Sequence, residues 1–501
     1  MHLSSKCVAV LLTALCASLT PTQLLRAQSS QTSALQSISA QSSIRSARIE
    51  EKSNSSPASR AATTASSEKK DTETSDDNDA YLSAVDKIST VILLHEIDLE
   101  RFYTGFRIVG SKEPNWRHAR YFWAQEAAAS LFFASQTTAL VEAAKGLHDP
   151  DKSSVRALKN SAVCGLIASV FEGGSSGLEL ASNATAAARH RRLKTDPESA
   201  RRTFVERLQV IDDLIKQRDQ LLISYETANS LPRLELEGRV LKFFRDRCIY
   251  EFADIYADIH SYQSSNNVYY VIDVAGSSLF VASYVLGLVG FSRADLNGPA
   301  YVTAIAADGP FIVSAQASVY AYDKIYKHYY DKLSKQVGET LYDAEPKAEA
   351  SVHELEKLVG SDAEPGAPDS VVTRIGVYKR WAGNYDQFIA RREVELRRMS
   401  KVSKQSEILG PIIGGSFLAS DIFGANASYH LKHNPKATAG NTFAGLVPTV
   451  LTSFVSAATT AGYFIDDEIH ARKLNREGAL PNELLDKRMT VLKNLEDTLK
   501  K

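Results

Sequence analysis

One stretch of the sequence matches a known catalytic pattern. Gly173-Gly174-Ser175-Ser176-Gly177 fits G-x-S-x-G, in which a sharp turn from strand to helix presents a serine nucleophile. The residues before it are rich in Ala, Gly and Ser at helical spacing, and no alternation of strands and helices surrounds it. We therefore interpret residues 173–177 as a chance match, and we expect no enzyme activity.

Metal-binding and redox motifs are equally weak. His430 and His433 could bring two imidazoles to one metal ion, but no third ligand is near, so we expect an exposed loop. His95 lacks the second histidine four residues on that a zinc-protease helix needs, and we expect it in the core. Outside the first 27 residues only Cys164 and Cys248 remain, too few for a disulfide framework. The sequence predicts no metal and no cofactor.

Overall charge gives little information about partners. The 501 residues contain 58 Lys and Arg against 59 Asp and Glu, a formal net charge of -1. A balanced chain has no general attraction to nucleic acid. We expect no nucleic-acid partner, and either a lipid bilayer or another protein as the partner.

The N-terminal region predicts an export signal followed by a linker. Residues 7–19 are apolar, and Ala27 offers a small residue for cleavage, which is typical of a secretory signal peptide over residues 1–27. Residues 28–78 hold twenty Ser or Thr and no Phe, Tyr or Trp, a composition that cannot form a core. We expect a disordered linker there, and an exported chain in the cell membrane, the periplasm or the extracellular space.

Residues 79–501 predict an all-α helical body. Apolar residues recur three or four positions apart, which indicates helices. Six apolar segments rich in small residues pair into three predicted hairpins, over about 122–187, 268–321 and 408–465. Charged, heptad-like helical connections lie between them, over 189–265 and 325–405.

The three hairpins have similar sequences and predict an internal repeat. Residues 130–135 read SLFFAS, residues 278–283 read SLFVAS, and residues 416–420 read SFLAS. Further along, Glu172-Gly173 corresponds to Asp308-Gly309. Repeat units that cannot bury their own apolar faces must pack on one another. We expect one continuous helical body, with oligomers possible.

The hairpins could lie either in a lipid bilayer or in water. Residues 443–465 contain no charge over 23 residues, and residues 274–291 none over 18, which favours membrane spans. The other four segments carry acids, and basic residues flank both ends of the hairpins, against the positive-inside rule. We predict a polytopic membrane bundle with a structural or scaffold role. The alternative is a soluble, exported helical module for binding or oligomerisation.

If the bundle spans a membrane, Glu172 and Asp308 are the candidate intramembrane polar site. Both precede residues that disturb helices, Gly173-Gly174 and Gly309-Pro310, so we expect broken helices there. An acid at membrane depth is a candidate for function. Two readings stay open: the acids bond to backbone groups freed by the break, or they line a transport path.

Overall fold

The computed structural model describes residues 74–111, 115–223, 231–337, 352–357 and 369–500. These residues form helices joined by short turns, without a strand among them, so the expected all-α class is confirmed for this part of the chain. The predicted signal peptide lies outside the described residues, as does the linker up to residue 73. The first described helix begins at Thr74, inside the stretch that we expected to be linker.

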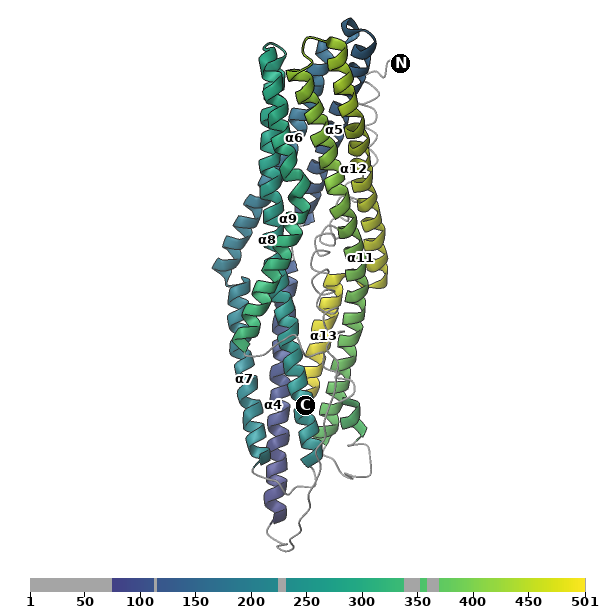
Figure 1. Cartoon of the computed structure of the whole chain (residues 1–501). Coiled ribbons are helices and arrows are strands. Elements are labelled where there is room, and N and C mark those ends of the chain that lie inside the picture. Colours follow the sequence, from purple (N-terminus) through teal and green to yellow (C-terminus); the bar gives the residue numbers. More distant parts are fainter. Residues whose placement is uncertain (1–73, 112–114, 224–230, 338–351, 358–368, 501) are drawn as a thin grey trace, which may run out of the picture.

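The helices form one elongated bundle (Figure 1). The chain runs through α4 (Thr74–Ser111), α5 (Asn115–His148), α6 (Val155–Leu193), α7 (Pro197–Ile223), α8 (Leu231–Gly290), α9 (Asn297–Val337), α11 (Asp369–Tyr429), α12 (Pro435–Glu477) and α13 (Pro481–Leu499). The longest, α8 and α11, have 60 and 61 residues. At 1.5 Å per residue each is about 90 Å long.

Three tight turns gather at the upper end of the bundle in Figure 1, between α5 and α6, between α8 and α9, and between α11 and α12. We call the part next to these turns the hairpin half. It comprises α5, α6 and residues 268–290, 297–321, 408–429 and 435–465. The rest of the described chain is the core half, which contains α4, α7 and α13. Much of each charged connection is therefore not a separate helix but the continuation of α8, α9 or α11.

The six helices of the hairpin half pack as a closed ring. In order around the bundle, α5 packs on α6, α6 on α8, α8 on α9, α9 on α11 and α11 on α12, and α12 returns to pack on α5. In the core half α4 contacts α7, α8, α11 and α13. The hairpin half thus has no first or last helix.

Local sequence signals explain where helices begin and end. The residues Asp196-Pro197-Glu198 have the sequence typical of a helix start. Asp196 accepts hydrogen bonds from the backbone N–H groups of Glu198 and Ser199 at 3.1 and 3.2 Å, so it caps α7. Asn434 caps α12 in the same way. Lys194 and Gly478 end α6 and α12 in the left-handed conformation, and a proline opens the next helix three residues later in both cases.

The expectation of broken helices is wrong. The helix α6 continues through Gly173-Gly174, α9 through Pro310 and α12 through Pro448. A proline inside a helix removes one backbone hydrogen bond, and packing against neighbouring helices can offset that loss. Neither Glu172 nor Asp308 lies at a break, so the reading in which these acids bond to freed backbone groups loses its basis.

The main hydrophobic core lies in the core half. Phe204 of α7 stacks on Phe252 of α8 with ring centroids 3.9 Å apart, and Phe244 of α8 stacks on Trp381 of α11 at 4.1 Å. Aliphatic side chains of α4, α7, α8, α11 and α13 surround these pairs. The core half is therefore packed as a water-soluble helical domain is, with its large apolar side chains inside.

Small residues allow the helices of the hairpin half to approach closely. A Cβ atom at Gly173 of α6 would lie 2.7 Å from Cβ of Ser277 on α8, whereas a Cβ atom at Gly174 would meet nothing within 4 Å. Side chains at Gly165 and Gly424 would overlap the rings of Tyr284 and Tyr301. Such contacts across small residues are typical of packing between membrane helices.

The adjacent glycines of α6 provide a direct test of this packing. We expect Gly173→Ala to lower the free energy of unfolding by about 1–3 kcal/mol, because the backbones of α6 and α8 must move apart. Gly174→Ala should be neutral, or stabilising by up to about 1 kcal/mol through helix propensity. Thermal unfolding of the purified chain measures both. Equal effects of the two substitutions would contradict close packing at Gly173.

Candidate functional site

The outer surface of the hairpin half is apolar. Large apolar side chains are exposed on all six of its helices. We call the following set the apolar belt: Val141 of α5, Val163, Ile167, Val170, Phe171 and Leu178 of α6, Val271, Val285 and Val289 of α8, Val302 and Val313 of α9, Ile408, Ile412 and Ile422 of α11, and Leu451, Phe454 and Val455 of α12. Soluble monomers rarely expose such a continuous surface.

The interior of the hairpin half is correspondingly polar or small. Its buried residues are mostly Ser, Ala, Gly and Thr, together with several acids. Ser135 of α5 donates a hydrogen bond to the backbone carbonyl of Ser161 on α6 at 2.8 Å, and Ser283 of α8 donates one to Ala300 on α9 at 2.9 Å. Polarity is therefore inverted relative to the core half.

Four helices of the described chain are long and apolar enough to cross a membrane. They are Pro232–Gly290, Ala294–Val337, Ile408–Tyr429 and Pro435–Thr459. In the most apolar stretch of each, only 11–28% of the residues are buried, so few of these apolar residues lie in the protein interior. Both segments that the sequence favoured as spans, 274–291 and 443–465, overlap this set.

Glu172 is half-buried on α6, where it faces α8 of the neighbouring hairpin. Its carboxylate accepts a hydrogen bond from Ser277 of α8 at 3.4 Å and lies within electrostatic range of Asp273, also on α8. Ser176, one turn further along α6, donates a hydrogen bond to Asp273. Glu172 and Asp273 therefore form an acid pair between α6 and α8.

Asp308 forms a second acid pair, between α9 and α11. It is 1% exposed, its carboxyl group acts electrostatically on that of Asp421, and neither oxygen has a hydrogen-bond partner of standard geometry in the described chain. The structure therefore does not bring Glu172 and Asp308 into contact. Tyr284 of α8 is within electrostatic range of members of both pairs, namely Asp421, Asp308 and Glu172.

Aromatic side chains meet inside the ring near Tyr284. The ring of Phe132 on α5 lies 6.3 Å from that of Phe280 on α8, 6.5 Å from Tyr284 and 6.4 Å from Phe417 on α11. Each of the three phenylalanines belongs to one of the similar SLFFAS, SLFVAS and SFLAS segments. The first helices of the three hairpins thus converge through these segments.

The motifs that suggested chemistry lie in plain structural settings. Residues 173–177 are in the middle of α6 rather than at a turn, and Ser175 donates a hydrogen bond to the backbone carbonyl of Glu172. His430 and His433 are exposed on the turn before α12. The expectation for His95 is wrong: it is exposed on α4, and Glu96 beside it is buried. No group of three His, Cys, Asp or Glu side chains in the described ranges could hold a metal ion.

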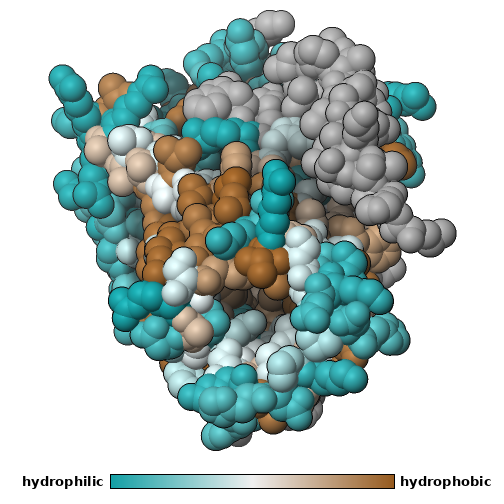
Figure 2. Space-filling model, turned by 90° about the horizontal axis from the view of Figure 1, so that it is seen from above, coloured by the Kyte–Doolittle hydropathy of each residue, from teal (hydrophilic) through white to brown (hydrophobic). Residues whose placement is uncertain are grey.

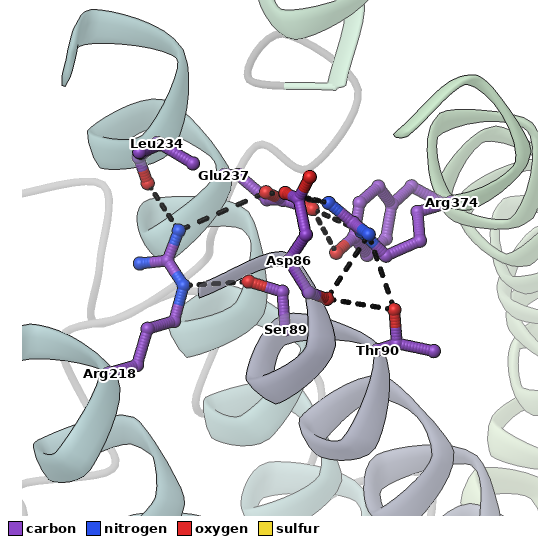
Figure 3. Close-up of polar contacts among 8 residues, drawn as sticks. Asp86, Ser89, Thr90, Arg218, Leu234, Glu237 and Arg374 are labelled. Carbon is purple, nitrogen blue, oxygen red and sulfur yellow. Dashed lines mark hydrogen bonds and ion pairs between the residues drawn. The ribbon is translucent and has the colours of Figure 1, made fainter. Parts of the chain in front are cut away.

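A buried ion-pair network joins four helices of the core half (Figure 3). Arg374 of α11 donates to Glu237 of α8 and to Asp86 of α4, both at 2.7 Å. Arg218 of α7 donates to Ser89 of α4 at 2.8 Å and to the backbone carbonyl of Leu234 on α8 at 2.6 Å. Two arginines and two carboxylates make the network neutral overall, which reduces the cost of burying it.

A second buried network fixes the C-terminal helix α13. Arg488 contacts Glu100 of α4 and Glu251 of α8, each at 2.6 Å. Trp381 of α11 donates its indole N–H to the same Glu100 at 2.5 Å. Opposite charge at Glu100 and Glu251 raises the pKa of the Arg488 guanidinium, although burial alone would lower it. Arg488 therefore stays charged and holds α13 against the bundle.

Glu96 of α4 is buried without a hydrogen-bond partner. It is 0% exposed, and neither carboxyl oxygen meets a donor within the described residues. Burial, and next the negative charge of Asp246, raise the pKa of Glu96 well above its ordinary value, while Arg245 opposes this. Tyr378 and Cys248 also face it. A buried charge without a partner is costly, so folding favours the protonated form.

This burial predicts a pH dependence of stability. Because the folded pKa of Glu96 is raised, the folded state holds this proton where the unfolded state has released it. Stability is therefore lost as pH rises above about 4.5, by at most about 1.4 kcal/mol per pH unit. We expect Glu96→Gln to flatten that decline in urea unfolding between pH 5 and 8. The exposed Glu206→Gln of α7 is the control, and its curve should run parallel to the wild type.

Comparisons with known proteins give no relative. No protein-family model, curated protein or solved structure matches this chain. The function must therefore be argued from the inverted polarity and the buried acids themselves.

Proposed function

We propose that the protein is an integral membrane protein of the cell envelope. In this proposal the hairpin half crosses the bilayer as a closed ring of six helices. The core half is a rigid helical body outside the membrane, with a structural or scaffold role. The observation that carries the proposal is the inversion of polarity between two halves of the same helices.

The dimensions of the hairpin half agree with this proposal. Its segments in α8 and α12 contain 18 to 23 residues without a charge, which span about 27–35 Å as helices. The hydrocarbon core of a bilayer is about 30 Å thick. Although α5 and α6 are not among the four apolar candidates, they complete the ring. Three of their acids have partners: Glu142 pairs with Lys145, Glu179 pairs with Arg117, and Glu172 accepts a hydrogen bond from Ser277.

Membrane extraction tests the proposal directly. The full chain is expected to stay in the membrane pellet after washing with alkaline carbonate and to need detergent for release. Release by carbonate or by osmotic shock would instead support the alternative, a soluble exported module whose apolar belt is buried in an oligomer. Size-exclusion chromatography without detergent would then give an oligomer rather than aggregates.

A transport path is the second candidate function, and the two acid pairs between helices of the ring favour it. Carboxyl groups at membrane depth are costly, so four of them in one bundle are a candidate for function. Replacement of both Glu172 and Asp308 by Ala should then change a leak or transport assay in proteoliposomes. If the variant inserts normally and every flux is unchanged, the transport role is excluded, while the structural role still stands.

Internal repetition is part of the proposal. The equivalent serines Ser135 and Ser283 make equivalent hydrogen bonds to the second helix of their hairpins. The helices α6 and α12 both end at a residue in the left-handed conformation, Lys194 and Gly478. The helices that follow them, α7 and α13, both pack on α4. These similarities support the view that the hairpins derive from one ancestral unit.

A further inference from the structure

The end of the bundle that carries the three turns is basic. Residues 142–159, 291–297 and 429–436 contain seven Lys or Arg against four Asp or Glu, a net charge of +3 with histidines neutral. The chain as a whole has a charge of -1, so positive charge is concentrated at this end. These segments are far apart in the sequence, and the fold brings them together at one end (Figure 1).

Several of these basic groups have no acidic partner. Lys152 and Arg293 pair with acids of their own turns, Asp149 and Asp295. In contrast, three basic side chains make no ion pair within the described residues: Arg156 on α6, Lys432 on the turn between α11 and α12, and Lys436 on α12. All three are exposed. The free charge therefore comes from two different hairpins.

Apolar side chains lie directly beside these charges. Lys159 extends over the ring of Phe291, 5.6 Å from its centroid. Val155 of α6 and Tyr429 of α11 are exposed at the same end. Figure 2 looks down on this end and shows apolar side chains gathered in the middle, with polar ones around them. Along the chain, Val155 is followed by the belt residue Val163, and Phe291 follows the belt residue Val289. The basic groups therefore lie at the end of the apolar belt.

We infer that the three turns form a binding surface for the headgroups of anionic phospholipids. The inference rests on the proposed membrane function. With the apolar belt in the hydrocarbon, Arg156, Lys432 and Lys436 lie at the depth of the lipid phosphates, which carry the complementary charge. The turns face the leaflet that is richer in anionic lipid.

The test uses the full chain in lipid nanodiscs made from phosphatidylcholine with 20% phosphatidylserine. Native mass spectrometry measures how many phosphatidylserine molecules stay bound as the lipid is removed. We expect the wild type to retain phosphatidylserine in preference to phosphatidylcholine. We expect the triple variant Arg156→Gln, Lys432→Gln, Lys436→Gln to lose the preference by about tenfold or more. High salt should weaken the wild-type preference, because exposed charges are screened.

A matched triple variant controls for charge alone. Lys216→Gln, Lys242→Gln and Lys379→Gln remove the same charge from exposed positions of the core half, and this variant should retain phosphatidylserine as the wild type does. Equal losses in both variants, or a wild type without preference, would overturn the inference. Carbonate extraction of the same samples separates the two proposals, because a chain that inserts but shows no preference refutes only the headgroup surface.

Discussion

Replacement of Arg374 by Met is expected to lower the free energy of unfolding by about 3–5 kcal/mol. Arg374 is 1% exposed, and its guanidinium is the group that neutralises Asp86 and Glu237 at 2.7 Å. Methionine fills much of the same volume but leaves two carboxylates buried without that charge. Urea unfolding of the purified chain, followed by circular dichroism, measures the loss.

A control on the same helix separates this effect from loss of any ion pair. Lys379 of α11 pairs with Glu356 at 2.8 Å, but its side chain is 64% exposed. Water screens such a pair, so Lys379→Met should cost no more than about 1 kcal/mol. Adding Glu237→Gln to Arg374→Met should recover part of the lost stability. A cost below 1 kcal/mol for Arg374→Met would mean that water reaches the network.

Helical periodicity and composition were sufficient to predict the fold class. The helical pattern of residues 79–501 and the cap at Asp196 correspond to helices in the structure. The sequence could not show that one helix carries both an apolar and a charged stretch, as α8 does. The sequence of α8 changes from charged to apolar near residue 266. Such a change usually marks the end of one helix and the start of another, but here the same helix continues. The burial of Glu96 was missed because His95 was placed in the core instead. Neighbouring residues of a helix point in different directions, so an error of one position exchanges a buried side chain for an exposed one.

The role of the candidate site stays a prediction. Sequence similarity between the hairpins selected Glu172 and Asp308, and both lie against neighbouring helices of the ring, Asp308 buried and Glu172 half-buried. Their partners Asp273 and Asp421 belong to other hairpins, 101 and 113 residues along the chain. Only the order of helices around the ring brings them together. The ion pairs of Arg374 and Arg488 were not predicted, since charged side chains on long helices usually face water.

Replacement of Leu451 by Arg distinguishes lipid from water around the belt. Leu451 is 62% exposed near the middle of the apolar part of α12. If lipid surrounds it, exchanging leucine for arginine at that depth should cost about 3–4 kcal/mol of insertion free energy. We therefore expect a large fall in the fraction of chains that resist carbonate extraction when the variant is expressed in membranes. The reason is that the arginine must draw its charge toward the interface or bring water into the bilayer.

The matched control is Val210→Arg on α7, which adds the same charge at an exposed apolar position of the core half, where Val210 is 45% exposed. Water surrounds that site whether or not the hairpin half lies in a membrane. The free energy of unfolding should therefore stay within about 0.5 kcal/mol of the wild type, and the fraction that resists carbonate extraction should not change. If Leu451→Arg is as harmless as Val210→Arg, the belt faces water or a protein partner, and the membrane function fails. If it instead disperses a detergent-free oligomer into monomers, the soluble oligomerising module takes its place.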